Sequence, residues 1–148
     1  MPSITRRLEI DAGHRLMNHE SKCRNAHGHR YVFEVTVSPR LGQGLDSVGR
    51  VIDFSVLKEK VAGWLDVTFD HGFMVEKGDP MVDWLVANAQ KHIVLDCPPT
   101  IENIVRIVYT NAAALLASSG LVVDNVRGYE TPNCYADYGI SEHAARHS

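Results

Sequence analysis

The stretch HGHRYVFEVTV, residues 27–37, decides the fold. Its odd positions carry two histidines followed by aromatic and aliphatic side chains, whereas its even positions are mostly polar. This alternation is typical of a strand with one buried face. A second stretch, ITRRLEIDAGH at residues 4–14, alternates in the same way. The pattern therefore predicts two strands, one ending at His14 and the other beginning at His27, with these histidines on the apolar faces.

Antiparallel pairing of these strands across the loop 15–26 would bring His14, His27 and His29 to one point. A lone histidine on an apolar face is more often a hydrogen-bonded core residue, but three that converge favour a metal site. Zinc held by three protein ligands keeps a fourth position open, as catalytic sites do. The spacing thus predicts a catalytic Zn²⁺ site. Cys23, in the connecting loop, is either a fourth ligand or a reactive thiol.

Composition sets the broad class. A chain of 148 residues with 45% hydrophobic content predicts a single globular domain over residues 1–148. The net charge of -3 and the lack of a long basic run argue against nucleic acid or membrane as a partner, and favour a small molecule. Three sparse cysteines and no apolar stretch of signal-peptide or membrane-span length predict a cytoplasmic protein.

The rest of the chain is expected to alternate strands and helices. The expected elements are a short strand at 50–54, a helix over 56–67 capped by Ser55, a helix from Pro80 to about Lys91, an extended piece at 93–95, a long helix from Ile101 that Thr100 caps and Gly120 ends, and a strand from 121 to about 130. This order predicts an α+β fold with helices on one face of an antiparallel sheet.

Other polar residues outside the histidine set are candidates for chemistry. The adjacent pair Asp70 and His71 is either a turn feature or an imidazole oriented by a carboxylate for acid–base work. Glu102 is either a charge that complements a helix dipole or a ligand contact. Glu130, at a strand end beside Thr131, can pair bidentately with the NH edge of a pterin or guanine.

Six segments together resemble one family. They are residues 11–16 (DAGHRL), 23–29 (CRNAHGH), 51–54 (VIDF), 70–71 (DH), 99–103 (PTIEN) and 129–132 (YETP). In this order they are similar to signature segments of the 6-pyruvoyltetrahydropterin and 6-carboxytetrahydropterin synthases. The resemblance spans Ile4 to about Tyr138, and residues 141–148 are expected to form a frayed tail.

The resemblance implies a tunnelling fold, in which a four-stranded antiparallel sheet carries helices on one side. It also implies a homo-oligomer, with trimers that close a barrel, stack as hexamers and hold active sites between subunits. Three residues separate Cys23 from His27-Gly28-His29, which resembles the 6-carboxytetrahydropterin synthases, whereas pyruvoyl-type members usually have five.

The implied activity is that of a zinc-dependent lyase of queuosine biosynthesis, acting on 7,8-dihydroneopterin triphosphate. The roles it implies are catalysis by Cys23, Asp70 and His71, pterin binding by Glu130, Glu102 and Thr100, and Zn²⁺ binding by His14, His27 and His29. Three alternatives remain open, namely a pyruvoyl-type synthase, a zinc hydrolase that would not need Cys23, and a non-catalytic pterin-binding protein.

Overall fold

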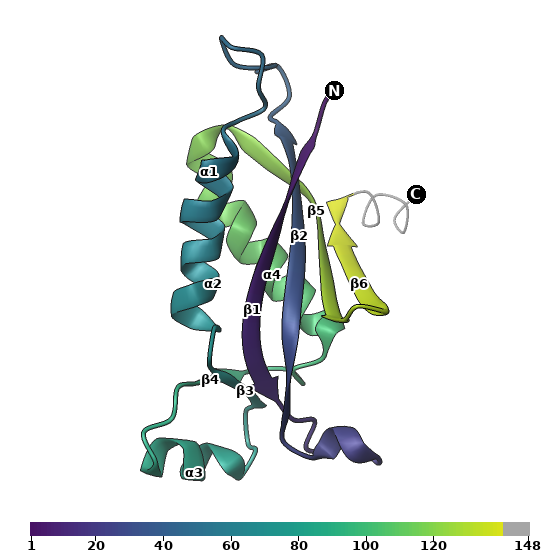
Figure 1. The fold of residues 1–148 in the computed structure, drawn as a ribbon, viewed down its shortest axis with the longest axis vertical. Coiled ribbons are helices and arrows are strands. Elements are labelled where there is room, and N and C mark those ends of the chain that lie inside the picture. The colour runs from purple at the N-terminus through teal and green to yellow at the C-terminus, as the bar shows by residue number, and fades with distance from the viewer. Residues whose placement is uncertain (141–148) are drawn as a thin grey trace.

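A six-stranded sheet in the order β4-β3-β1-β2-β5-β6 forms the framework of the computed structural model, which describes residues 1–140 (Figure 1). The expected tail at 141–148 lies outside the described residues. The strands are β1 (Ile4–His14), β2 (His27–Pro39), β3 (Phe73–Glu76), β4 (His92–Leu95), β5 (Leu121–Thr131) and β6 (Cys134–Gly139). Strands β1, β2, β5 and β6 pair with one another in antiparallel fashion. Strand β3 is parallel to β1, and β4 is parallel to β3.

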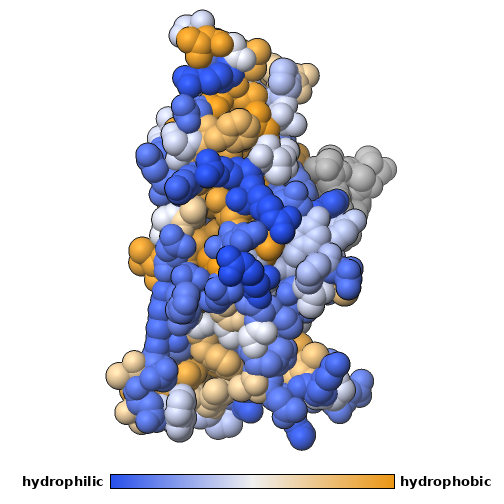
Figure 2. Space-filling view, in the orientation of Figure 1, coloured by the Kyte–Doolittle hydropathy of each residue, from blue (hydrophilic) through white to orange (hydrophobic). Residues whose placement is uncertain are grey.

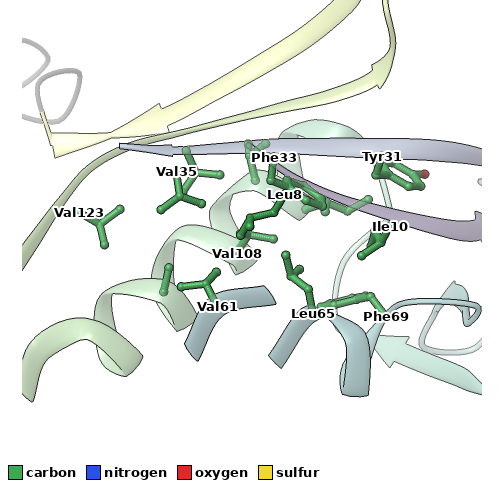
Figure 3. Close-up of a cluster of buried hydrophobic side chains, with 14 of the residues drawn as sticks. Leu8, Ile10, Tyr31, Phe33, Val35, Val61, Leu65, Phe69, Val108 and Val123 are labelled. Atoms are coloured by element: carbon green, nitrogen blue, oxygen red, sulfur yellow. The ribbon is translucent and has the colours of Figure 1, made fainter. Parts of the chain in front are cut away.

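Two helical runs cover one face of this sheet (Figure 1). One consists of α1 (Phe54–Leu57), the π-type turn η2 (Lys58–Ala62) and α2 (Gly63–Thr68), and the other of α4 (Ile101–Leu116) and the short η3 (Ala117–Ser119). Figure 3 shows side chains of β1 and β2, such as Leu8 and Phe33, pointing at Val61 and Val108 on the helices. All four are buried, so the apolar faces predicted for the two strands form the core.

The first two strands pair as the sequence predicts. The register places His14 opposite His27 and Ala12 opposite His29, so both strand ends that carry histidines lie at the same edge of the molecule. The short helix η1 (Lys22–Arg24) lies in the loop that joins them (Figure 1).

The α+β class with helices on one face is confirmed, but the third predicted strand is wrong. Residues 50–54 form no strand, because Asp46 accepts backbone hydrogen bonds from Val48 and Arg50, which folds the loop on itself. The cap of the following helix is Asp53 rather than Ser55, and the helix begins at Phe54. The fourth antiparallel strand is instead β6, and β3 also was not predicted.

Helix ends follow local chemistry. The Thr100 side chain accepts a hydrogen bond from Asn103 N, and Gly120, at φ 70°, ends the helical run that begins at Ile101, both as expected. Helix α3 (Met81–Ala87) is shorter than predicted, because Ala89 adopts a left-handed φ of 52°. The predicted extended piece at 93–95 is confirmed as part of β4.

None of the helices formed by residues 1–140 has the length and apolarity that crossing a membrane requires.

Candidate functional site

Three imidazoles meet where β1 ends and β2 begins. One nitrogen from each of His14, His27 and His29 lies within 4.8 Å of the other two. The His14 and His27 Nε2 atoms are 3.1 Å apart. His14 is almost completely buried, and the other two are half-buried. The predicted convergence of the three histidines is therefore present.

The hydrogen bonds of these imidazoles fix which nitrogen is free. His14 Nδ1 donates to the Pro99 carbonyl and His27 Nδ1 donates to the Asn25 carbonyl, each at 2.7 Å. Carbonyl oxygens only accept, so each Nε2 of a neutral ring carries a lone pair. Two lone pairs facing each other at 3.1 Å repel unless a cation lies between them. Carbonyl bonds of this kind orient the histidine ligands of metal sites.

The third imidazole supports the same interpretation. His29 Nε2 is buried and has no hydrogen-bond partner. Burial lowers the pKa of His14, against the opposing effects of the Pro99 carbonyl and of Glu130, and burial likewise lowers the pKa of His29. Both rings are thus neutral at neutral pH, the form in which imidazole binds metals. The three residues fit a metal ion that prefers nitrogen ligands, of which Zn²⁺ is the commonest in such sets.

Glu130, near the end of β5, reaches the same point. Its Oε1 atom lies 3.3 Å from His14 Nε2 and 3.6 Å from His29 Nε2. Glu130 also lines a cavity of about 550 Å³ together with His29, Tyr129 and Thr131. This cavity has the size of a small-molecule site.

The segment before α4 also contacts the histidine cluster, through the Pro99 carbonyl. Thr100 follows it and uses its side-chain oxygen to cap the helix, and Glu102 is exposed in the first turn. Thr100, the first predicted substrate residue of this segment, therefore directly follows a residue that contacts His14.

Asp70 and His71 lie in a hydrogen-bonded turn at residues 69–72, called here the Asp-His turn. The Asp70 carboxylate accepts hydrogen bonds from Asp11 N at 2.9 Å and from His71 Nδ1 at 2.8 Å. His71 N donates to the Asp11 carbonyl, and Lys91 Nζ donates to the Asp70 carbonyl. The bond from Asp11 N is the main cause of the lowered pKa of the Asp70 carboxyl. Asp70 is therefore ionised at neutral pH and orients the imidazole of its neighbour.

The His71 side chain faces outward. It is 77% exposed, and its recorded partner is Asp70 rather than a histidine of the cluster. Its φ of 57° is strained for a residue with a side chain, a feature that gathers at functional sites. A second cavity of about 540 Å³ is lined by His71, Trp84 and Lys91, among others. Within residues 1–140 the Asp-His turn has no direct contact with the three histidines, although His71 and His29 both line this second cavity.

Cys23 lies in η1, between the strands that carry the histidines, and is half-buried. Its carbonyl accepts a hydrogen bond from Leu16 N, which ties η1 to the chain just after β1. Arg15, which directly follows His14, is already paired, since its guanidinium donates to both carboxylate oxygens of the buried Asp79.

The sequence did not predict the residues that contact the histidines and hold them in place. The contact between His14 and Pro99 spans 85 positions, so no local pattern could reveal it. Tyr31 was readable as the next residue on the apolar face of β2, and its ring lies 5.9 Å from that of His14 and 5.6 Å from that of His29. No signal pointed to the Arg15–Asp79 pair.

The fold and the cluster define an α+β protein with a three-histidine set able to hold a metal ion. Residues 3–141 match the family model described as 6-pyruvoyl tetrahydropterin synthase. The chain belongs to this family. A relative from Rickettsia bellii named 6-carboxy-5,6,7,8-tetrahydropterin synthase is 37% identical over 140 residues, covering 93% of this chain and 99% of the relative. One of the same name from Haemophilus influenzae is 28% identical, with the same coverage.

Solved structures agree on the fold. The 6-pyruvoyl tetrahydropterin synthase of Caenorhabditis elegans superposes with a TM-score of 0.66 and 25% identity, covering 95% of this chain and 97% of that one. An uncharacterized protein from Wolinella succinogenes reaches a TM-score of 0.80 at 20% identity, covering 93% and 97%. The expected tunnelling fold is thereby confirmed.

Proposed function

We propose that this chain is a zinc-dependent 6-carboxy-5,6,7,8-tetrahydropterin synthase of queuosine biosynthesis. It would convert 7,8-dihydroneopterin triphosphate and water into 6-carboxytetrahydropterin, acetaldehyde and triphosphate. The observation that carries the proposal is the cluster of three imidazoles whose ring nitrogens converge on one point. The relatives named for this reaction, at 34–37% identity over nearly their whole length, support the choice of substrate.

A zinc ion held by the three histidines would act as a Lewis acid that acidifies the side-chain hydroxyls of the substrate. The chain itself supplies the proton transfers. We assign the base that removes a side-chain proton to the Cys23 thiolate, and the partner acid or base to His71. Asp70 holds the His71 imidazole by its Nδ1, so that Nε2 is the atom that exchanges a proton.

Pterin recognition is assigned to three further residues. Glu130 would accept hydrogen bonds from the 2-amino and N3 groups of the pterin, since a carboxylate matches that edge bidentately. Thr100 and Glu102 would assist Glu130 in holding the pterin. They lie at the start of α4, just after Pro99, whose carbonyl contacts His14.

Assembly is part of the proposal. The exposed His71 side chain has no recorded contact with the histidine cluster of its own chain. We therefore propose a homo-oligomer, a trimer or hexamer, in which the Asp-His turn of one subunit faces the metal cluster of the next. We further propose a single synthase domain and a cytoplasmic location, with which the three free cysteines are consistent.

Product analysis tests the reaction. Zinc-loaded protein is incubated with 7,8-dihydroneopterin triphosphate, and the pterin is identified by mass while any acetaldehyde is trapped. Cys23→Ala and His71→Ala should each lower kcat by roughly 10²–10⁴-fold. The matched controls Cys134→Ala and His92→Ala should retain kcat. Absence of turnover with every pterin tried would leave a pterin-binding protein, and full activity of Cys23→Ala would favour a zinc hydrolase.

The second candidate is a pyruvoyl-type synthase, which the description of the family model and the Caenorhabditis elegans structure favour. It would use the same residues, release triphosphate and keep all three side-chain carbons. An intact 6-pyruvoyl side chain without acetaldehyde would establish this alternative.

A further inference from the structure

We infer that Glu130 is a fourth metal ligand in the substrate-free protein and that substrate displaces it. The inference rests on the metal site of the proposed function. It adds a ligand exchange to that site. The Glu130 carboxylate would occupy the fourth coordination position before substrate binds, and it would turn to the pterin edge when the substrate hydroxyls take that position.

Distances between donor atoms support this assignment. In a tetrahedral zinc site with bonds of about 2.0–2.1 Å, neighbouring ligand atoms are roughly 3.3–3.4 Å apart. The structure places Glu130 Oε1 at 3.3 Å from His14 Nε2 and at 3.6 Å from His29 Nε2. His14 Nε2 and His27 Nε2 are 3.1 Å apart. These three distances are close to the edge of such a tetrahedron.

The lack of a positively charged partner for the Glu130 carboxylate supports the assignment independently. His14 donates through Nδ1, so the carboxylate oxygen faces a lone pair rather than an N–H. Within residues 1–140, Glu130 forms no recorded ion pair with lysine or arginine, and its polar contacts are the two imidazoles. A partly buried carboxylate without a donor or cation is costly. A metal ion at the centre would satisfy the carboxylate and the imidazole lone pairs together.

The backbone aims this side chain. The pairing of β5 with β6 shifts between Tyr129 and Thr131, so Glu130 is the extra residue of a β-bulge. Bulges re-aim side chains and are frequent beside active sites. Gly128, two residues earlier, is buried on the core face, the face on which the histidines of β2 also lie. A bulge at this position lets a strand-end carboxylate reach the cluster.

Zinc affinity without substrate tests the inference. Competition with a chromophoric chelator at neutral pH would compare the wild type, Glu130→Gln and Glu34→Gln. Glu34 lies on β2 but on the opposite face from His27 and His29, so it controls for the loss of one negative charge. Glu130→Gln should weaken zinc binding at least about tenfold and Glu34→Gln should not. Equal affinity of the two variants, both folded by circular dichroism, would overturn the inference.

The spectrum of the Co²⁺-substituted protein identifies the fourth donor. Glu130→Gln should shift the visible ligand-field bands, and no sulfur-to-cobalt charge-transfer band should be present. A charge-transfer band that Cys23→Ser removes would assign the fourth position to Cys23 instead. These measurements use the metal alone, so failure of the proposed reaction would leave their outcome unchanged.

Discussion

Substitution of Asp79 by asparagine tests how strongly the site is anchored to the segment that carries α3. The Asp79 side chain is fully buried and accepts three hydrogen bonds, two from Arg15 at 2.6 and 2.5 Å and one from Met81 N at 2.8 Å. Arg15 directly follows His14, so this pair connects the end of β1 that carries the histidine to the segment just before α3. In Asp79→Asn an amide N–H would face the guanidinium, which cannot accept it, and the partly buried Arg15 cation would lose its counter-charge.

The expected loss follows from these contacts. Breaking a shielded, bidentate ion pair by removing one partner costs about 3–5 kcal/mol, and the 24% exposure of the Arg15 side chain places this case at about 3 kcal/mol. For a chain of this size, 3 kcal/mol corresponds to roughly 6–12 °C in Tm. The assay is urea unfolding of the metal-free protein, which removes the contribution of metal binding. Asp83→Asn, at an exposed position in the first turn of α3, should change stability by less than about 1 kcal/mol. A loss no larger than that of this control would refute the reasoning, because the pair would then behave as a surface ion pair.

Three further predictions concern packing, pH and the Asp-His turn. Gly128→Ala should destabilise the protein by about 1–3 kcal/mol in urea unfolding, since the new methyl would overlap a valine side chain of α4, whereas Gly63→Ala, in open space on a helix, should be neutral or stabilising. The metal-free protein should lose stability as pH falls below about 6.5, because His14 and His29 have lowered pKa values in the folded state and therefore bind protons more readily in the unfolded chain. Thermal unfolding between pH 7.5 and 5 measures this loss, and a Tm that does not change with pH would contradict it. Lys91→Met removes the ammonium that donates to the backbone carbonyls of Asp66 and Asp70. It should lower kcat more than it raises KM and shift the pH profile of kcat. A purely structural role of Lys91 would leave that pH profile unchanged.

The sequence by itself determined the elements that local chemistry encodes. Period-two alternation in β1 and β2 requires only neighbouring residues, so it predicted both strands, their buried faces and the three convergent histidines. The cap at Thr100 and the end at Gly120 are likewise set within a few residues.

Only the tertiary structure decided which distant segments complete the site. Strand β3 has four residues, pairs with β1 at two positions and lacks a pattern of its own, and β6 alternates too weakly to be recognised. The Pro99 carbonyl that orients His14 lies 85 positions further along the chain, and the contact between Glu130 and His14 joins the end of β5 to the end of β1. Such contacts are fixed by the packing of the whole sheet against its helices, which no local pattern encodes. The convergence of the three histidines was therefore readable from the sequence, and the positions of Pro99 and Glu130 against them were not.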